Sequence, residues 1–199
     1  CAVLYRTNAQ SRLFEEKFIV SNIPYKIVGG VNFYARKEIK DLLAYLKTID
    51  NARDDLAVRR IINVPKRGIG ATTLNRVADY AAAADISFYN ALKMADDIPT
   101  LGKSAAKIKP FVNFIQVMRS KVEIISVSEL LQEIIDETGY VKELEAEDTE
   151  EAKARIENID ELISKVVAYE EGEEHPTLSG FLEEVALVAD IDSLDEGSD

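Results

Sequence analysis

The residues best suited to chemistry form a short turn between positions 63 and 70. The turn reads Asn63-Val64-Pro65-Lys66-Arg67-Gly68-Ile69-Gly70. Pro65 predicts that a preceding helix stops here, because the residue before a proline is pushed out of the α region. Gly68 and Gly70 permit positive φ and a close approach of another backbone. We expect Ile69, between the two glycines, to anchor the turn in the core.

The helix that follows this turn is a candidate anion site. Thr72 or Thr73 can cap the helix, and its first amides and positive end attract phosphate. Between Leu56 and Ala78 there is no acid, and there are five basic residues: Arg59, Arg60, Lys66, Arg67 and Arg76. The pattern predicts a helix–hairpin–helix that grips a nucleic-acid backbone without reading bases. The alternative is an ordinary turn with solvated charges.

A second basic run lies between Ile98 and Val122, again without an acid. Its members are Lys103, Lys107, Lys109, Arg119 and Lys121. Gly102-Lys103-Ser104 resembles the end of a phosphate-binding loop, but Asp97 stands where the pattern requires glycine. Further backbone contacts are predicted at Lys103 and Lys107, with a solvated helix face as the alternative.

Two basic residues, Lys153 and Arg155, lie in the acidic part of the chain. They are predicted to contact a phosphate, or alternatively to pair with Glu150, Glu151 and Glu157.

No arrangement of side chains predicts catalysis. The sequence contains no nucleophile–base pair, and His175 stands alone in an acidic stretch. One Cys and one His cannot supply the ligands of a zinc cluster. Paired acids such as Asp54-Asp55 occupy adjacent helical positions, which do not share a face. We therefore predict no catalytic residue, metal or cofactor in this chain. A nuclease with a carboxylate metal site is an alternative that no motif supports.

The net charge of −12 hides two halves of opposite sign. Residues 1–122 contain 20 Lys and Arg and 11 Asp and Glu, a net charge of +9, whereas residues 123–199 contain 4 and 25, a net charge of −21. The first half suits nucleic acid, and the second suits a basic protein partner. A protein-interaction module without DNA contact is therefore the alternative function.

No apolar run approaches the roughly 20 residues of a membrane span, and a single Cys is consistent with the cytoplasm.

The pattern of apolar residues predicts a mainly α fold of many helices. Residues 1–5 and 25–28 are predicted strands flanking a helix, a βαβ unit. Two strands do not make a sheet, and the chain has no initiating Met, so we expect a fragment of a longer protein. Helices are predicted from residue 36 onward and over residues 56–63, 72–84, 87–94, 102–124, 127–137, 149–170 and 177–189. Gly139 is a predicted C-cap, and the acidic tail after Ala189 is expected to fray.

Four stretches together resemble the UvrD/PcrA/Rep family of superfamily 1 DNA helicases. They are Ala2–Arg12, Pro24–Asp41, Asn63–Gly70 and Arg155–Leu162, in the order expected for the family. The resemblance implies that residues 1–30 are a piece of the RecA-like motor domain 2A. Residues 31–199 would then be the helical insertion domain 2B.

The resemblance also implies functions for particular residues. Arg6 and Asn8 would contact single-stranded DNA. The duplex backbone would be contacted by Lys66, Arg67, Gly68, Ile69, Gly70 and Thr73. Gly29 and Gly30 would be a hinge. The resemblance implies a cytoplasmic, nucleoid-associated bacterial 3′–5′ helicase acting in DNA repair and replication, whose ATP and magnesium sites lie outside this chain. Its partners would be DNA and the remaining domains of the helicase, with no membrane.

Overall fold

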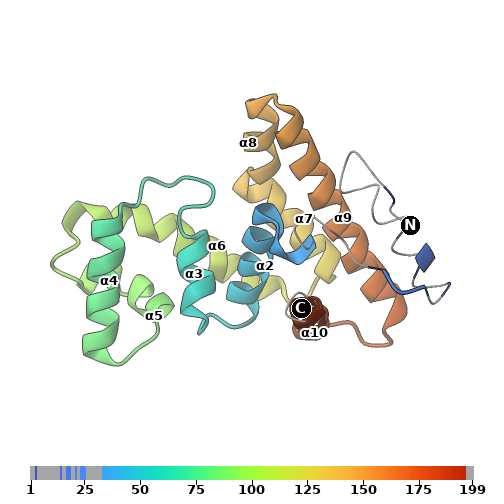
Figure 1. The fold of residues 1–199 in the computed structure, drawn as a ribbon. Helices are drawn as coiled ribbons and strands as arrows, with labels where there is room; N and C mark the ends of the chain where they lie inside the picture. The colour runs from blue at the N-terminus through green and yellow to red at the C-terminus, as the bar shows by residue number, and fades with distance from the viewer. Residues whose placement is uncertain are drawn as a thin grey trace.

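The computed structural model describes residues 33–195 and, before them, only Val3, Phe14, Lys17, Phe18, Ser21 and residues 23–25 (Figure 1). Within residues 33–195 the chain forms helices and no strand, which confirms the mainly α prediction for this part. Most of the predicted βαβ unit, together with Arg6, Asn8, Gly29 and Gly30, lies outside the described residues.

The helices follow one another with short connections. They are η1 (Phe33–Ala35), α2 (Lys37–Asp50), α3 (Asp55–Ile61), α4 (Ala71–Ala84), α5 (Phe88–Lys93), η2 (Ala95–Asp97), η3 (Gly102–Ser104), α6 (Ala105–Lys121), α7 (Val127–Thr138), α8 (Tyr140–Glu147), α9 (Glu150–Gly172) and α10 (Leu178–Asp195).

Helix α2 lies at the centre of the fold. Apolar residues follow each other three or four positions apart along it, which places them on one broad face. Ile39, Leu42, Leu43, Leu46 and Ile49 are all at most 6% exposed. Each such side chain contributes about 1.5–3 kcal/mol when it leaves water. Helices α3, α6, α7, α9 and α10 all pack against α2, so that one helix organises a single core.

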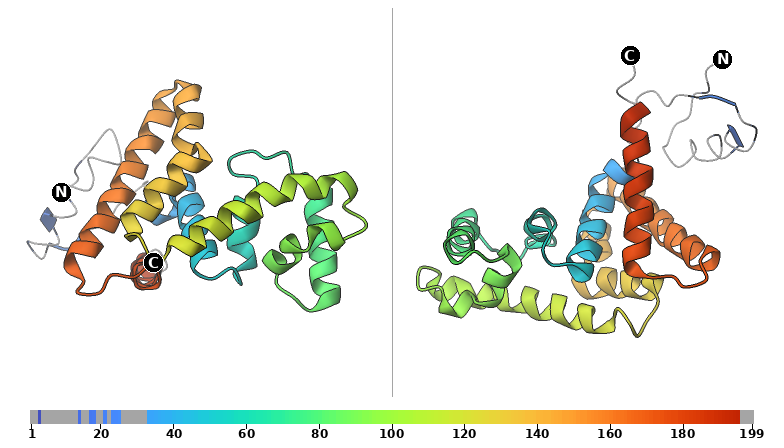
Figure 2. Two further views of the ribbon diagram at one scale, coloured as in Figure 1. Left: turned by 180° about the vertical axis from the view of Figure 1, so that it is seen from behind. Right: turned by 90° about the horizontal axis from the view of Figure 1, so that it is seen from below.

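The remaining helices form two lobes on either side of α2. We call α3–α6 the hairpin lobe and α7–α10 the acidic lobe. Helix α6 is the last helix of the hairpin lobe and runs to the start of α7, as both views in Figure 2 show. In the acidic lobe α7, α8 and α9 pack on one another, and α10 lies beside the end of α2.

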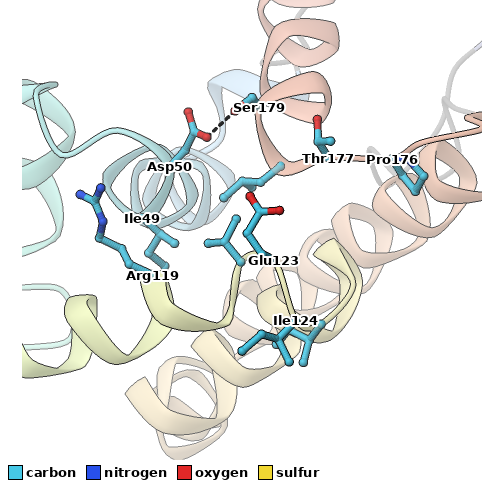
Figure 3. A pocket seen from close by; sticks show the side chains of 11 residues that line it. Ile49, Asp50, Arg119, Glu123, Ile124, Pro176, Thr177 and Ser179 are labelled. Atoms are coloured by element: carbon cyan, nitrogen blue, oxygen red, sulfur yellow. Dashed lines mark hydrogen bonds between the residues drawn. The ribbon is translucent and has the colours of Figure 1, made fainter.

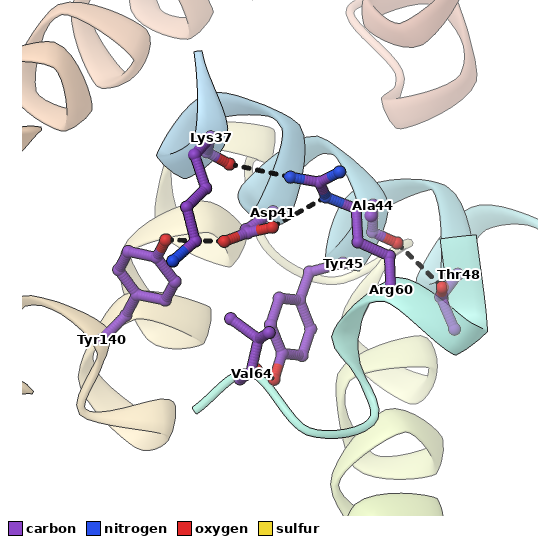
Figure 4. A network of polar contacts seen from close by, with 8 residues as sticks. All are labelled: Lys37, Asp41, Ala44, Tyr45, Thr48, Arg60, Val64 and Tyr140. Atoms are coloured by element: carbon purple, nitrogen blue, oxygen red, sulfur yellow. Dashed lines mark hydrogen bonds and ion pairs between the residues drawn. The ribbon is translucent and has the colours of Figure 1, made fainter. Parts of the chain in front are cut away.

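Two buried carboxylates, Asp41 and Glu38, join α2 to the two lobes, and Figure 4 shows the contacts of Asp41. Asp41 accepts a hydrogen bond from Nε of Arg60 in α3 at 2.7 Å and another from the hydroxyl of Tyr140 in α8 at 2.8 Å. Burial, followed by the neighbouring carboxylate of Asp41, raises the pKa of Tyr140 far above its ordinary value. Glu38 accepts from Nδ2 of Asn158 in α9 at 2.6 Å. Arg36 donates to the other end of that amide, so the second and fourth resemblance stretches contact each other.

One prediction about the helices is corrected by the structure. Gly139 does end α7, with φ of 70°, but it also begins the unpredicted helix α8. Only Tyr140 and Leu144 of α8 are buried, a periodicity too short to detect. Helix α10 extends to Asp195, and fraying of the acidic tail stays a prediction.

Candidate nucleic-acid interface

The turn between α3 and α4 is a hairpin held by its own side chains. The Oδ1 atom of Asn63 accepts hydrogen bonds from the amides of Arg67 and Ile69, at 3.2 and 3.1 Å. The Nδ2 atom of the same residue donates to the carbonyl of Ile69. The side chain of Ile69 is 3% exposed and belongs to the core, as predicted. The hairpin is therefore a rigid loop anchored at both its start and its tip.

The two glycines of the hairpin have different conformations. Gly68 has φ of +68°, the left-handed region that glycine alone enters without strain, and this confirms the prediction for that position. Gly70 has φ of −76° and is the N-cap of α4, so it does not adopt the positive φ that glycine permits. The predicted threonine cap was wrong, because no side chain caps α4 and Thr73 is buried within the helix. Gly70 and Thr72 are exposed at the start of α4.

Arg67, a predicted contact of the duplex backbone, points into the hairpin rather than toward solvent. Its Nη1 atom lies 2.9–3.3 Å from the carbonyl oxygens of Ile61, Ile62, Val64 and Pro65. Its Nη2 atom donates to the hydroxyl of Tyr45 at 2.6 Å. The carbonyls of Ile61 and Ile62 lie at the C-terminal end of α3, where positive charge is favourable.

Residues from two distant helices complete the setting of Arg67. The guanidinium lies 5.2 Å from the ring centroid of Phe111 in α6. The hydroxyl of Tyr45 in α2 donates to the carbonyl of Val64. Burial raises the pKa of Tyr45, against the opposing effect of Arg67. Sequence reasoning missed Tyr45, although its position on the apolar face of α2 was a signal that it points into the core.

Most of the basic residues near the hairpin are committed to contacts within the protein. Arg59 lies over the ring of Phe88, with 4.3 Å to its centroid. Arg60 pairs with Asp41, and Arg76 donates to the carbonyl of Thr100 at 2.6 Å. In the second run, Lys109 pairs with Asp96 and Lys121 with Glu133. The acid-free runs therefore overstate the charge that is free to meet a ligand.

Three lysines of the two basic runs have their charge unpaired within the described part of the chain. Lys66 is exposed at the tip of the hairpin. Lys107, also exposed, reaches across from α6 and donates to the carbonyl of Gly68 at 3.1 Å. Lys103 is exposed four residues earlier, at the start of the same helical segment. The structure thus brings Lys107 to Gly68 and leaves Lys66 and Lys103 open to solvent.

Lys153 and Arg155 lie on α9 and pair with neighbouring glutamates. Lys153 Nζ is 2.8 Å from a carboxylate oxygen of Glu150. Arg155 contacts Glu151 and, at 4.0 Å, Glu147. The structure thus shows pairing of the kind that the sequence offered as the alternative to phosphate contact.

A separate pocket of about 410 Å³ lies where α2 ends, α6 turns into α7 and α10 begins (Figure 3). Its lining includes Arg119, Glu123 and the exposed Ile124, and Ser179 donates to Asp50 at 2.5 Å across one side.

Among the described residues no group of three or more His, Cys, Asp or Glu side chains could hold a metal ion. None of the described helices is long and apolar enough to cross a membrane.

The chain is similar to known proteins over nearly its whole length. The family model described as UvrD-like helicase C-terminal domain matches residues 1–197. The ATP-dependent DNA helicase PcrA of Bacillus subtilis is 47% identical over 195 residues, which cover 98% of this chain and 26% of that relative. The proteins of the same name from Staphylococcus aureus strain Mu50 and Staphylococcus epidermidis are 46% and 45% identical over 196 residues, covering 98% of this chain and 27% of each relative. The chain spans about a quarter of the length of these relatives.

Proposed function

This chain belongs to the family of UvrD-like helicase C-terminal domains, and we propose that it is a non-catalytic, duplex-DNA-binding and regulatory segment of an ATP-dependent 3′–5′ DNA helicase. Relatives that are nearly half identical to it are named ATP-dependent DNA helicases, which supports DNA as the ligand. The helicase would act in DNA repair and replication, in the cytoplasm of a bacterium and at its nucleoid. ATP and magnesium would bind to parts of the helicase outside this chain.

The observation that carries the proposal is the exposed tip of the hairpin. Lys66 is free to contact a phosphate, while Gly68 presents backbone without a side chain, and Lys107 lies beside it. Asn63, Arg67 and the buried Ile69 hold this loop in one conformation, so little entropy is lost when it binds. Contacts of this type position a protein on the duplex and read no bases.

The proposed site differs from the one expected from sequence. Arg67 and Thr73 shape or support the hairpin and are not assigned contacts with DNA, because their polar atoms point inward or are buried. Lys153 and Arg155 are not assigned contacts with DNA either, because each forms an ion pair with a neighbouring glutamate. Arg6 and Asn8 as single-strand contacts, and Gly29 and Gly30 as a hinge, stay predictions from the resemblance.

Salt dependence tests the proposal. For each phosphate contact the association constant falls with salt at a logarithmic slope of about −0.9, so one contact is worth roughly eightfold at 0.1 M relative to 1 M salt. Lys66→Ala should therefore weaken duplex binding about eightfold at low salt, for every sequence alike, and the two curves should converge at high salt. Fluorescence anisotropy of a labelled duplex at several salt concentrations measures the affinity and its salt slope.

Lys142→Ala is the matched control, because Lys142 is exposed on α8 and its loss changes the net charge equally. Coincident curves for Lys66→Ala and wild type would overturn the proposal. In the full helicase, Lys66→Ala should impair duplex engagement and leave ATP hydrolysis stimulated by single strands largely intact. Saturable ATP turnover by this chain alone would contradict its non-catalytic assignment.

The charge of the second half favours a different candidate function. Residues 123–199 carry a net charge of −21, and Glu171, Glu173 and Glu174 are exposed in and beside the α9–α10 turn. These residues suit docking of a basic protein surface, in which case the acidic lobe would be an interaction module. Binding of a basic protein that survives Lys66→Ala, but is lost when these three glutamates become glutamine, would favour that function.

A further inference from the structure

Both ends of the hairpin tip are bonded to a single buried oxygen atom. The hydroxyl of Tyr45 in α2 donates to the carbonyl of Val64 and accepts a hydrogen bond from Nη2 of Arg67 at 2.6 Å. These two residues flank Pro65 and the exposed Lys66, and Figure 4 shows the ring of Tyr45 pointing from α2 toward Val64. One hydroxyl therefore fixes where the segment that carries Lys66 begins and where it ends.

The ring that carries this hydroxyl is itself held in place. Tyr45 is 0% exposed, and its ring meets that of Phe114 in α6 edge to face, with 5.9 Å between the centroids and 88° between the planes. Close-packed interiors leave a buried ring little room to shift. The ring cannot follow a moving loop, so its hydroxyl is a fixed anchor for the hairpin.

The hydroxyl of Tyr45 uses both of its hydrogen-bonding roles on the hairpin. A hydroxyl has one hydrogen to donate and lone pairs to accept with, and here Val64 takes the hydrogen while Arg67 donates to the oxygen. Asn63 cannot replace it, because its bonds to the amides of Arg67 and Ile69 run within the hairpin. Asn63 shapes the loop, whereas Tyr45 ties the loop to the central helix.

We propose that Tyr45 is a positioning residue for duplex binding, which holds Lys66 where it meets the phosphate backbone. The inference rests on the proposed function of the hairpin. Tyr45 is wholly buried, so it acts through the hairpin and not by touching DNA. When a binding conformation is only partly populated, the apparent dissociation constant rises in inverse proportion to that population. Loss of the anchor therefore weakens binding without removing any charge from the surface.

Tyr45→Phe tests this inference on the intact chain, because phenylalanine keeps the ring and removes both bonds. Duplex binding should weaken about three- to tenfold, as expected when the binding conformation falls to roughly a third to a tenth of the population. The salt slope should stay as in wild type, since the bound state contacts the same phosphates. The curves for Tyr45→Phe and wild type should thus run parallel, whereas the curve for Lys66→Ala should converge with wild type at high salt.

Two other tyrosines supply matched controls for the same chemical change. The hydroxyl of Tyr89 is buried and has no hydrogen-bond partner within the described part of the chain. Tyr89→Phe should therefore leave binding unchanged. The hydroxyl of Tyr140 donates to Asp41 at 2.8 Å in the acidic lobe. Tyr140→Phe should lower the melting temperature and leave duplex binding as in wild type. Anisotropy is measured at a temperature at which circular dichroism shows every variant to be folded.

Hydrogen exchange supplies a readout of the hairpin that needs no DNA. The amides of Arg67 and Ile69 are bonded to Asn63 in the closed hairpin. Tyr45→Phe should accelerate their exchange relative to the core amides of α7 and α9, whereas Tyr140→Phe should not single them out. A merely structural role for Tyr45 would change the exchange of hairpin and core together.

The outcomes separate this inference from the proposed function. If Lys66→Ala weakens binding while Tyr45→Phe binds as tightly as Tyr140→Phe, the inference is overturned and the proposed function stands. If Lys66→Ala coincides with wild type, the proposed function fails and the inference fails with it. Tyr45→Phe should also cost less affinity in a Lys66→Ala background than in wild type. An undiminished cost there would show that Tyr45 does not act through Lys66 and would overturn the inference.

Discussion

Replacing Arg67 by alanine should unfold the hairpin rather than remove a phosphate contact. The guanidinium donates from Nη1 to the carbonyl oxygens of Ile61 and Ile62, at 2.9 and 3.2 Å, and from Nη2 to Tyr45 at 2.6 Å. Alanine supplies none of these hydrogens, so the carbonyls of Ile61 and Ile62 would lose the donor that Arg67 provides. We therefore expect Arg67→Ala to reduce the free energy of unfolding.

The expected loss can be worked out from the bonds. Nη1 has two hydrogens, so its four short distances amount to two charge-assisted bonds, and Nη2 adds a third. After allowance for partial exposure, three such bonds amount to about 2–4 kcal/mol. For a chain of this size that corresponds to a fall of roughly 5–15 °C in melting temperature. Arg67→Lys should recover little of it, because an ammonium cannot span carbonyls and a hydroxyl as a planar fork does.

Thermal and urea unfolding of the intact chain measure this effect, with Lys66→Ala as the neighbouring control that should melt like wild type. Duplex binding at several salt concentrations supplies the second readout. If Arg67→Ala melts with wild type and lowers the salt slope as Lys66→Ala does, Arg67 faces DNA and the reasoning from its contacts is refuted.

Further substitutions test the backbone and the buried polar groups. Gly68→Ala should cost on the order of 1 kcal/mol because φ is positive there, whereas Gly70→Ala should be nearly neutral, since its φ is −76° and a Cβ would meet nothing within 4 Å; equal urea midpoints would contradict this difference. Gly180→Ala should destabilise the chain because its Cβ would lie 2.3 Å from the hydroxyl of Tyr169, and the cost should shrink in a Tyr169→Phe background, as a double-mutant cycle can measure. The pKa of Tyr140 is raised in the folded state, so its contribution to stability should be complete below the unfolded value of about 10 and lost as the pH rises above it. Tyr140→Phe should flatten the decline of the unfolding midpoint in that alkaline range.

The helices could be predicted from sequence wherever apolar spacing is long enough. Ile39, Leu42 and Leu46 mark α2, and every one of them is buried. Gly139 was identified as a cap because a left-handed residue commonly ends a helix. Helix α8 was missed because eight residues with two buried side chains carry almost no periodic signal.

The hairpin was predicted in outline, while the direction of its side chains was not. Glycine is compatible with either sign of φ, so the sequence could not distinguish Gly68 from Gly70. Arg67 turns inward because Tyr45 and Phe111 converge on it from helices 22 residues earlier and 44 residues later in the chain. A count of charges cannot reveal such a long-range setting, and for this reason the basic run appeared more available to DNA than it is.

The position of Tyr45 and Asp41 on α2 has a mechanical consequence. They lie four residues apart, one turn of a single helix, and Tyr45 is bonded to the hairpin while Asp41 is bonded to Tyr140 of the acidic lobe. A load applied at the hairpin therefore reaches α8 through two side chains and one helical turn, without crossing a loop. Helix α2 is thus a structural element that both lobes share. A force applied at the hairpin would therefore move the hairpin lobe and the acidic lobe together, because Tyr45 and Asp41 connect both lobes to one helix.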